Sequence, residues 1–380
     1  MGGVSMEWKE CQIQDVCRLI NGRAYSNDEM LEHGKYKIVR VGNLSGGNST
    51  WFYSDLELPA DKYCHNGDLL FAWACTFGPH IWKEDNTIFH YHIWKIVEDK
   101  DVVDRRFFYY YLKFATGGFL GALNGSVMVH ITKSSMEKMN IRIPQNLEDQ
   151  RRIASILSSL DRKIELNNKI NADLEEMAQA IFKNWLSECS DDVTIGELSL
   201  NITNYEKTDA EEVVLINSSD VTEGYFDHHN YSPNKNLKGH FKKRFQKGDI
   251  LYSQVRPRNR HWAYCNFDAN DYLASTQLMV IRNNPSLITS ILLYQYIISD
   301  NVWKEFTLKT ETRSGTFPQG NYEDLSQIRV PYNSDVEGIS NQLETLYAKM
   351  FMLEKENSRL SLLRDTLLPR LMSGEIEIPE

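Results

Sequence analysis

The sequence has 380 residues, of which 42% are hydrophobic and 25% are charged. This composition is typical of a globular protein with two or three domains, and it excludes collagen-like or wholly disordered structure. The net charge is −10, because 42 Lys and Arg face 52 Asp and Glu. A chain this acidic does not coat nucleic acid through its overall charge, so any DNA binding must come from local basic patches.

The sequence carries no signal for export, a membrane span or a disulfide framework. No stretch approaches about 18 apolar residues, and residues 1–10 lack the basic and apolar regions of a secretory signal, so we expect a cytoplasmic protein without membrane contact. The six cysteines contain no C-x2-C pair, which favours free thiols over a disulfide scaffold or a zinc ribbon. Met6 begins a more ordinary N-terminus than residues 1–5, which are either native or an extension.

Two short motifs recur about half a chain apart. The tetrapeptide GDLL at 67–70 is repeated as GDIL at 248–251, and the tetrapeptide IRIP at 141–144 is repeated as IRVP at 328–331. The second spacing is slightly longer than the first, as a few loop insertions would cause. We interpret the repeat as a tandem duplication of about 186 residues.

Each half has the same order of elements. Short β-like runs precede an aromatic helical stretch, a proline and a long helical segment. The sequence therefore predicts a mixed α/β (α+β) fold, in which two globular domains are joined by two long antiparallel coiled-coil helices with pseudo-two-fold symmetry. The expected segments are a first domain at 1–145, a central helix at 146–190, a second domain at 191–332 and a C-terminal helix at 333–380.

The two long helices, expected at 147–186 and 336–371, carry matching apolar seams. Forty helical residues span about 60 Å, so we interpret the pair as a spacer rod. Pro369 predicts a kink or an effective end near Thr366. One seam position holds Ile153, Leu160, Asn167, Leu174 and Ile181 in the first helix and Leu346, Leu353, Leu360 and Leu367 in the second, and the other holds Ile156, Lys163, Ile170, Met177 and Asn184.

Polar residues interrupt this seam at Asn167 and Lys163. A polar residue at such a position commonly fixes the register of a coiled coil at some cost in stability. Contact with another protein is an equally weighted alternative.

Motifs for catalysis are absent from the sequence. It has no Asn/Asp-Pro-Pro-aromatic loop, no G-x-G-x-x-G after a strand and no G-x-x-x-x-G-K-[ST], so methyl transfer and nucleotide chemistry are not expected and no cofactor is predicted. A cryptic metal-dependent nuclease could use residues 98–100 (Glu-Asp-Lys), but such triplets are common by chance.

His80, His90 and His92 could form a metal triad. The duplication argues against it, because the second half has Ser275 and Gln277 at the positions of His90 and His92. Hydrogen-bonding side chains are therefore expected there, and no metal site.

The overall pattern resembles the specificity subunit of Type I restriction-modification systems across essentially the whole chain. The second half departs from the pattern at 317–319, where Phe-Pro-Gln replaces the His-Ile-Thr of the first half. The resemblance is carried by Trp8-Lys9-Glu10 with Asn21-Gly22, the repeated GDLL and GDIL strands, the turn from Gly125-Ser126 to His130-Ile131-Thr132-Lys133, Pro144 followed by Gln150-Arg151-Arg152-Ile153-Ala154, and the LLPRLMSGEI ending at 367–376.

The resemblance implies a non-catalytic subunit with two target-recognition domains that binds double-stranded DNA. It also implies that the chain bridges two modification (methyltransferase) subunits and recruits restriction (translocase/endonuclease) subunits. Because the two domains differ almost everywhere outside the framework, the expected target is bipartite and asymmetric. The alternatives are a coiled-coil protein scaffold, an inactive specificity homologue without DNA readout, and the cryptic nuclease.

Residues 238–261 contain eight Lys and Arg against the single acid Asp249, a local charge of +7. Such a patch can be a solvated surface or a DNA-binding face, because base and phosphate contacts need Arg, Lys, Asn or Gln. The equivalent loop of the first domain, 73–80, has no Arg or Lys, so contacts there would come from His80, Lys83 and Lys133 or from shape and stacking. The candidate DNA-binding residues are Lys242, Lys243, Arg244, Gln254, Arg256, Arg258, Asn259 and Arg260 in the second domain and His80, Lys83 and Lys133 in the first.

Overall fold

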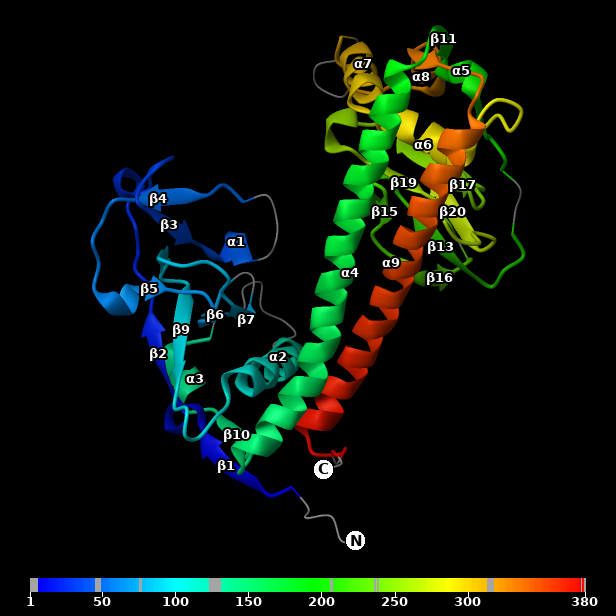
Figure 1. Ribbon diagram of the computed structural model, residues 1–380. Helices are drawn as coiled ribbons and strands as arrows, with labels where there is room; N and C mark the ends of the chain where they lie inside the picture. The colour runs from blue at the N-terminus through cyan, green and yellow to red at the C-terminus, as the bar shows by residue number, and fades with distance from the viewer. Residues whose placement is uncertain are drawn as a thin grey trace. The chain divides into compact units, whose positions relative to one another are not determined.

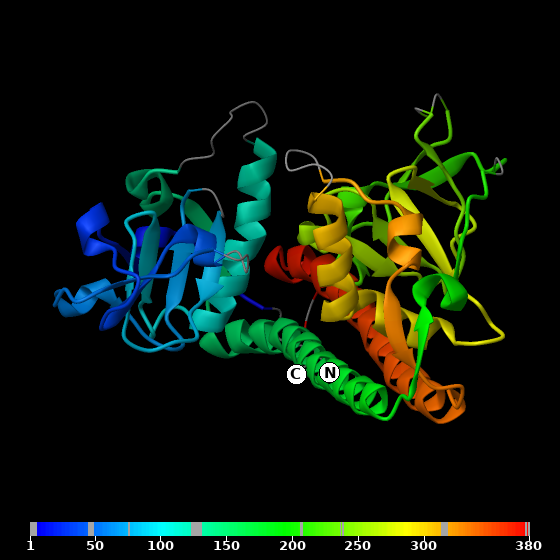
Figure 2. The same ribbon diagram turned by 90° about the horizontal axis from the view of Figure 1, so that it is seen from above.

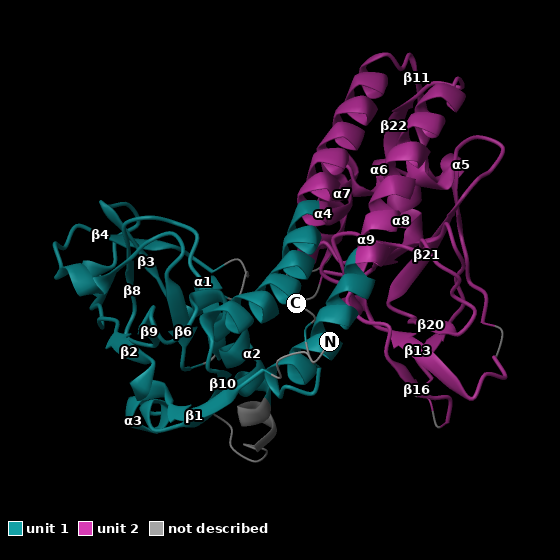
Figure 3. Ribbon diagram, turned by 60° about the horizontal axis from the view of Figure 1, so that its bottom comes forward, with its two compact units in different colours: residues 1–166, 357–380 teal, residues 167–356 magenta. Residues whose placement is uncertain are grey.

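A computed structural model describes residues 6–44, 49–74, 77–122, 131–205, 208–235, 237, 239–312, 318–376 and 378, with side chains omitted at 118–122. The predicted features at 125–130, Cys75-Thr76, Lys238 and Phe317 lie outside these residues. The chain divides into two compact units, one made of 1–166 with 357–380 and the other of 167–356 (Figure 3). The long helices α4 (Leu147–Ser187) and α9 (Glu337–Met372) each contribute to both units.

The first unit contains a two-stranded sheet β1-β10 and two four-stranded sheets, β2-β9-β6-β7 and β4-β3-β8-β5 (Figure 1). Its strands are β1 (Trp8–Gln12), β2 (Cys17–Asn21), β3 (Tyr36–Val39), β4 (Phe52–Ser54), β5 (Tyr63–Cys64), β6 (Leu69–Ala72), β7 (Gly78–Ile81), β8 (Thr87–Phe89), β9 (Ile93–Glu98) and β10 (Asn140–Pro144), and its short helices are α1 (Val41–Leu44), α2 (Arg105–Ala122) and α3 (Lys133–Glu137).

Helix α2 covers the β2-β9-β6-β7 sheet (Figure 2). Leu69 and Phe71 of β6 and Phe107 of α2 are completely buried, and each such side chain stabilises the fold by about 1.5–3 kcal/mol. The helix begins after Asp104, whose carboxylate accepts hydrogen bonds from the backbone N–H groups of Arg106 (3.0 Å) and Phe107 (3.1 Å). These bonds satisfy donors that a helix leaves unpaired at its N-terminus.

The second unit repeats this arrangement. Its strands are β11 (Asp191–Thr194), β12 (Ser199–Asn201), β13 (Glu212–Ile216), β14 (Val221–Thr222), β15 (Tyr225–Phe226), β16 (Tyr231–Pro233), β17 (Phe241–Lys243), β18 (Ile250–Ser253), β19 (Trp262–Tyr264), β20 (Tyr272–Ser275), β21 (Leu278–Asn283) and β22 (Arg329–Tyr332), and its helices are α5 (Ile195–Leu198), α6 (Ser290–Ile298), α7 (Asp300–Glu311) and α8 (Tyr322–Ser326).

The strand orders confirm the predicted duplication. The sheets β11-β22, β12-β21-β18-β19 and β16-β13-β20-β17 match β1-β10, β2-β9-β6-β7 and β4-β3-β8-β5 in turn. In the last pair of sheets, β3 runs parallel to β8 and β13 runs parallel to β20. Gly67 and Gly248, which open the repeated motif, have φ angles of +88° and +93°, a conformation that favours glycine.

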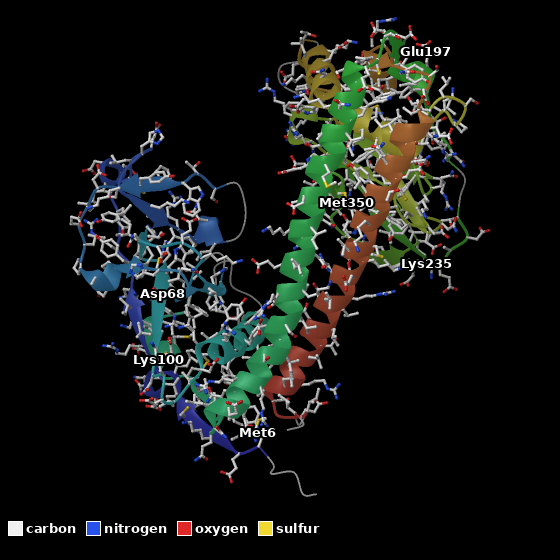
Figure 4. The ribbon with its side chains drawn as sticks, in the orientation of Figure 1. Met6, Asp68, Lys100, Glu197, Lys235 and Met350 are labelled. Carbon is white, nitrogen blue, oxygen red and sulfur yellow. The ribbon has the colours of Figure 1, made fainter. Side chains whose placement is uncertain are left out.

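The long helices pack antiparallel, as predicted, because Asp161 pairs with Arg364 in the first unit and Asn171 with Met350 in the second. Met350, labelled in Figure 4, lies on α9 and its carbonyl accepts the Asn171 side-chain amide at 3.4 Å. Ile153, Asn167 and Leu353 of the predicted first seam position are buried. The remaining predicted members of that position, Leu160, Leu174, Ile181, Leu346, Leu360 and Leu367, are partly buried.

The second seam position predicted for α4 is wrong at three of its five residues, while Ile156 and Ile170 are partly buried. Met177 is 51% exposed, and Lys163 and Asn184 are also exposed. The inward position holds Leu157, Ile164, Asn171, Ala178 and Trp185, which are buried or partly buried. The spacing from the first seam position is therefore four residues, not three.

Of the two outcomes predicted for Pro369, a kink or an end near Thr366, the end does not occur. The helix continues through Pro369 to Met372, and the Ser373 N–H still bonds to the Pro369 carbonyl at 3.0 Å. Leu371 and Met372 are buried in the core of the first unit, and this packing outweighs the hydrogen bond that proline cannot donate. None of the helices described is long and apolar enough to cross a membrane.

Candidate nucleic-acid interface

The loop that joins β18 to β19 in the second unit carries most of the predicted DNA-binding residues. This loop, residues 254–260, is called the arginine loop below. The side chains of Arg256, Arg258 and Asn259 are exposed, and those of Gln254 and Arg260 are partly buried. The structure therefore brings these five residues together at the end of one buried strand.

Two arginines of this loop have strained backbone conformations. Arg256 and Arg260 are left-handed, with φ angles of 48° and 53°. Such a conformation costs a non-glycine residue about 1–3 kcal/mol and persists only where the surroundings impose it. Here the Arg256 N–H donates to the Pro318 carbonyl (3.0 Å) and the Gln254 carbonyl accepts from the Gly320 N–H (2.8 Å). Strain of this kind is often found at functional sites.

Helix α7 holds the loop from one side. The Trp303 indole N–H donates to the Pro257 carbonyl at 2.9 Å, and the Arg260 guanidinium lies 4.3 Å from the Trp303 ring. Arg260 also pairs with Asp300 at 3.2 Å, and Arg258 donates to Glu311 at 2.7 Å. A DNA phosphate or base that binds these arginines must therefore compete with two carboxylates.

The three predicted basic residues on and after β17 differ in accessibility. Lys242 is exposed. Lys243 points into the core, where its ammonium donates to the Leu278 carbonyl at 2.6 Å and burial lowers its pKa. Because Lys243 is buried and Lys242 is exposed, we remove Lys243 from the candidate DNA-binding residues. Arg244 is partly buried, and its Nη1 has no hydrogen-bond partner among the described residues.

The equivalent loop of the first unit joins β6 to β7 and is aromatic. The Trp73 N–H donates to the His92 carbonyl at 3.1 Å, just as the Gln254 N–H donates to the Gln277 carbonyl at 2.9 Å. The two loops therefore occupy the same place in the two units. The sequence indicates shape or stacking as one means of contact for this loop, but it does not show that Trp73 lies beside Tyr91 and His92.

The predicted DNA-binding residues of the first unit do not lie together. His80 and Lys83 line a cavity of about 1150 Å³ between β7, α2 and α4, where burial and the charge of Lys113 lower the His80 pKa. Lys83 bonds to Glu165 of α4. Lys133 is the first residue of α3 and lies 3.6 Å from Glu137. Their role in DNA contact stays a prediction.

The residues suggested for a nuclease have structural partners instead. Glu98 is buried and pairs with Arg105 at 2.7 Å, while the Asp99 N–H donates to the Val16 carbonyl. In the part of the chain that the structure describes, no three His, Cys, Asp or Glu side chains are placed to hold a metal ion. His90, one of the three histidines considered as metal ligands, has its pKa lowered to about 4 by burial and by the nearby His92 and Arg40.

Comparison with known proteins identifies the same architecture. Residues 6–176 match the Type I restriction modification DNA specificity domain. The chain is 36% identical over 136 residues to the HindI specificity subunit of Haemophilus influenzae, which covers 36% of this chain and 30% of that protein. It is 25% identical over 179 residues to the EcoBI specificity subunit of Escherichia coli, covering 46% of this chain and 36% of that one. The matched segments thus span about a third of these two relatives.

A solved structure resembles the whole fold. The S subunit of a Type I restriction-modification system from M. genitalium superposes with a TM-score of 0.62 over 96% of both chains, at 16% sequence identity. The chain thus has the fold of that S subunit, with two duplicated α/β domains that share a pair of long helices. By these likenesses the chain resembles the Type I restriction-modification specificity subunits, and the family model itself covers residues 6–176.

Proposed function

We propose that this chain is a sequence-specific DNA-binding subunit that reads a bipartite, asymmetric target. One observation carries the proposal: the same loop follows the same strand in both units, and its side chains are arginine-rich in one unit and aromatic in the other. Arginine reads base edges and phosphates, whereas aromatic groups make apolar base contacts. Two loops of such different chemistry favour two different half-sites.

The long helices are proposed to bind two modification subunits. Leu166 of α4 and Met352 of α9 hold equivalent positions in the two copies of the duplication, and they are 52% and 56% exposed. Met177 and Leu363 form a second equivalent pair, with the same spacing along the chain, and are 51% and 47% exposed. Each helix thus presents one leucine and one methionine in duplicate positions, and exposed apolar side chains of this kind favour protein contact. Recruitment of restriction subunits is proposed from the family alone.

The proposed subunit is not itself an enzyme. Glu98 is already committed to Arg105, which supports a structural role for the only nuclease-like triplet considered. Titration of the full chain with S-adenosylmethionine in a calorimeter is expected to give no heat of binding. Saturable binding of the methyl donor to this chain alone would overturn the non-catalytic assignment.

Selection from random duplex DNA tests the proposed function. The full chain assembled with its methyltransferase subunits is expected to enrich two short motifs separated by an unread gap, whereas the methyltransferase alone enriches none. Assembly without any enrichment would favour the scaffold alternative. Cleavage by the isolated chain with a divalent metal, lost in Lys100→Ala, would favour the nuclease.

A further inference from the structure

Three side chains form a compact aromatic surface at the loop end of the first unit. Trp73, Tyr91 and His92 are called the aromatic surface below. The Tyr91 and His92 rings are 3.8 Å apart between centroids, and the Trp73 and His92 rings are 5.0 Å apart with their planes at 79°. Tyr91 is 40% exposed, and the other two side chains are partly buried. Aromatic groups that remain open to solvent in this way favour contact with a partner.

Contacts made by Trp73 hold the aromatic surface rigid. The Trp73 indole N–H donates to the Tyr91 carbonyl at 2.9 Å, which ties the loop after β6 to the turn between β8 and β9. The Trp73 ring also stacks on the buried Trp94 ring, at 5.9 Å and 22°. A rigid aromatic group loses little conformational entropy when it binds, so it is well suited to recognition.

The loop that carries Trp73 supplies no positive charge for phosphate binding. The loop at 73–80 has no Arg or Lys, unlike the arginine loop of the second unit. His90, directly beside the surface, has its pKa lowered to about 4 by burial and by His92 and Arg40, so it is neutral near pH 7. Of the features in the DNA major groove, the thymine methyl group is the one that apolar side chains recognise.

We infer that the aromatic surface reads at least one A·T pair of the first half-site through contact with the thymine methyl group. This inference rests on the proposed function and adds to it the base class and the residues. The two units then recognise their half-sites by different means. The arginine loop uses charged hydrogen bonds, and the aromatic surface uses shape and apolar contact. Trp73 holds the position of Gln254, a candidate base contact of the second unit, and His92 holds that of Gln277 beside it.

The test uses the full chain assembled with its methyltransferase subunits. Motifs are selected from random duplex DNA with the wild type, with Tyr91→Ala and with His92→Ala. Both variants are expected to relax an A·T requirement in one half-site and to leave the other half-site unchanged. Deoxyuridine in place of thymidine at that position, which removes only the methyl group, is expected to weaken wild-type binding about fivefold or more. The same replacement should hardly affect Tyr91→Ala.

Tyr231→Ala is the matched control, because Tyr231 is a 54% exposed tyrosine on β16 of the second unit. It is expected to select the wild-type motif. If Tyr91→Ala melts well below the wild type, Tyr91→Phe and His92→Gln are tested instead. At least one variant must then bind DNA with deoxyuridine as tightly as DNA with thymidine. Unchanged half-sites in every variant, or a wild type insensitive to deoxyuridine in both half-sites, would overturn the inference. A wild type that enriches no motif would instead refute the proposed function.

Discussion

The side-chain amide of Asn167 on α4 donates a hydrogen bond of 2.8 Å to the carboxylate of Glu356 on α9. Asn167 is completely buried in the helix seam, where an apolar residue would pack better. A buried amide that bonds to one residue of the facing helix favours the correct register of the helix pair over the neighbouring registers, in which that bond is lost. Asn171, four residues later, makes a second such bond to the Met350 carbonyl.

A double-mutant cycle tests this register bond. Asn167→Ala and Glu356→Ala are each expected to lower the free energy of unfolding, with a coupling of about 1 kcal/mol, because the bond involves a charged acceptor in a partly buried seam. Chemical denaturation of the full chain measures it. Lys163→Ala is the control and should change stability by less than about 0.5 kcal/mol, since Lys163 is exposed. A coupling free energy near zero would show that the bond from Asn167 to Glu356 does not fix the register of the two helices.

Arg256→Gly should separate stability from DNA binding. Glycine adopts a φ of 48° without strain, so the free energy of unfolding is expected to rise by about 0.5–1 kcal/mol. Affinity for the selected DNA should nevertheless fall, because the guanidinium is lost. Arg256→Ala, which keeps the strained backbone, should weaken binding equally without the gain in stability. If both variants bind DNA like the wild type, Arg256 is not a DNA contact.

Removal of a competing carboxylate should strengthen DNA binding. Glu311→Gln frees Arg258 from its ion pair, so binding is expected to tighten at low salt and to depend more steeply on salt concentration. Arg258→Ala and Arg260→Ala should each weaken specific binding by about 1–3 kcal/mol if they contact bases. Lys242→Ala should lower affinity for all sequences and flatten the salt dependence. Titrations of DNA at several salt concentrations distinguish these outcomes.

The second unit should lose stability as the pH rises through neutrality. Burial raises the pKa of Glu354 to about 7, with a further contribution from Glu175. The folded state therefore holds this proton more tightly than the unfolded chain, whose carboxyl has a pKa near its ordinary value. The resulting stability is fully present below about pH 4.5 and is lost as the pH rises through about 7, by about 1–3 kcal/mol in total.

Glu354→Gln, which mimics the protonated acid, should flatten this profile between pH 5 and 8. Denaturation at each pH provides the measurement. Glu344→Gln is a control on the exposed side of the same helix and should leave the slope unchanged. Parallel profiles for the wild type and Glu354→Gln would show that Glu354 does not hold the proton.

The duplicated apolar positions on the helices should each govern one partner subunit. Leu363→Asp and Met177→Asp are each expected to reduce the number of methyltransferase subunits bound from two to one, because a charge in an apolar contact is costly. Mass measurement of the purified complex counts the subunits. The thermal transition of the free chain should change little, since both side chains are about half exposed. Full assembly in the double variant would place the contact elsewhere.

Much of the architecture could be predicted because it repeats. The GDLL and IRIP motifs recur with their strands, and Gly67 and Gly248 adopt the same turn. The second seam position could not be chosen from the pattern. Ile156 and Leu157 are both apolar, and a helix that packs on a domain as well as on its partner has a wide apolar stripe, so spacings of three and four fit equally.

The residues of the candidate site could be named from the sequence where they are charged, whereas for the aromatic loop the sequence indicates only shape or stacking. The arginine loop follows a recognisable strand, so its residues could be grouped from the sequence alone. Lys243 could not be separated from Lys242, because the phase of β17 depends on its pairing with β20. Trp73 and His92 are far apart in sequence, and only the pairing of β6 with β9 brings them together.

Sequencing of methylated bases in host genomes tests the central claim most directly. The methyltransferase subunits are expressed alone, with this chain, and with a chain carrying Arg256→Ala and Arg260→Ala. With the wild-type chain, methylation is expected at one asymmetric motif of two short parts and an unread gap, and no such motif should be methylated without the chain. The double variant should relax one part of the motif and keep the other. Methylation at the same sites in the absence of the chain, or a motif unaffected by the arginine loop, would contradict the account.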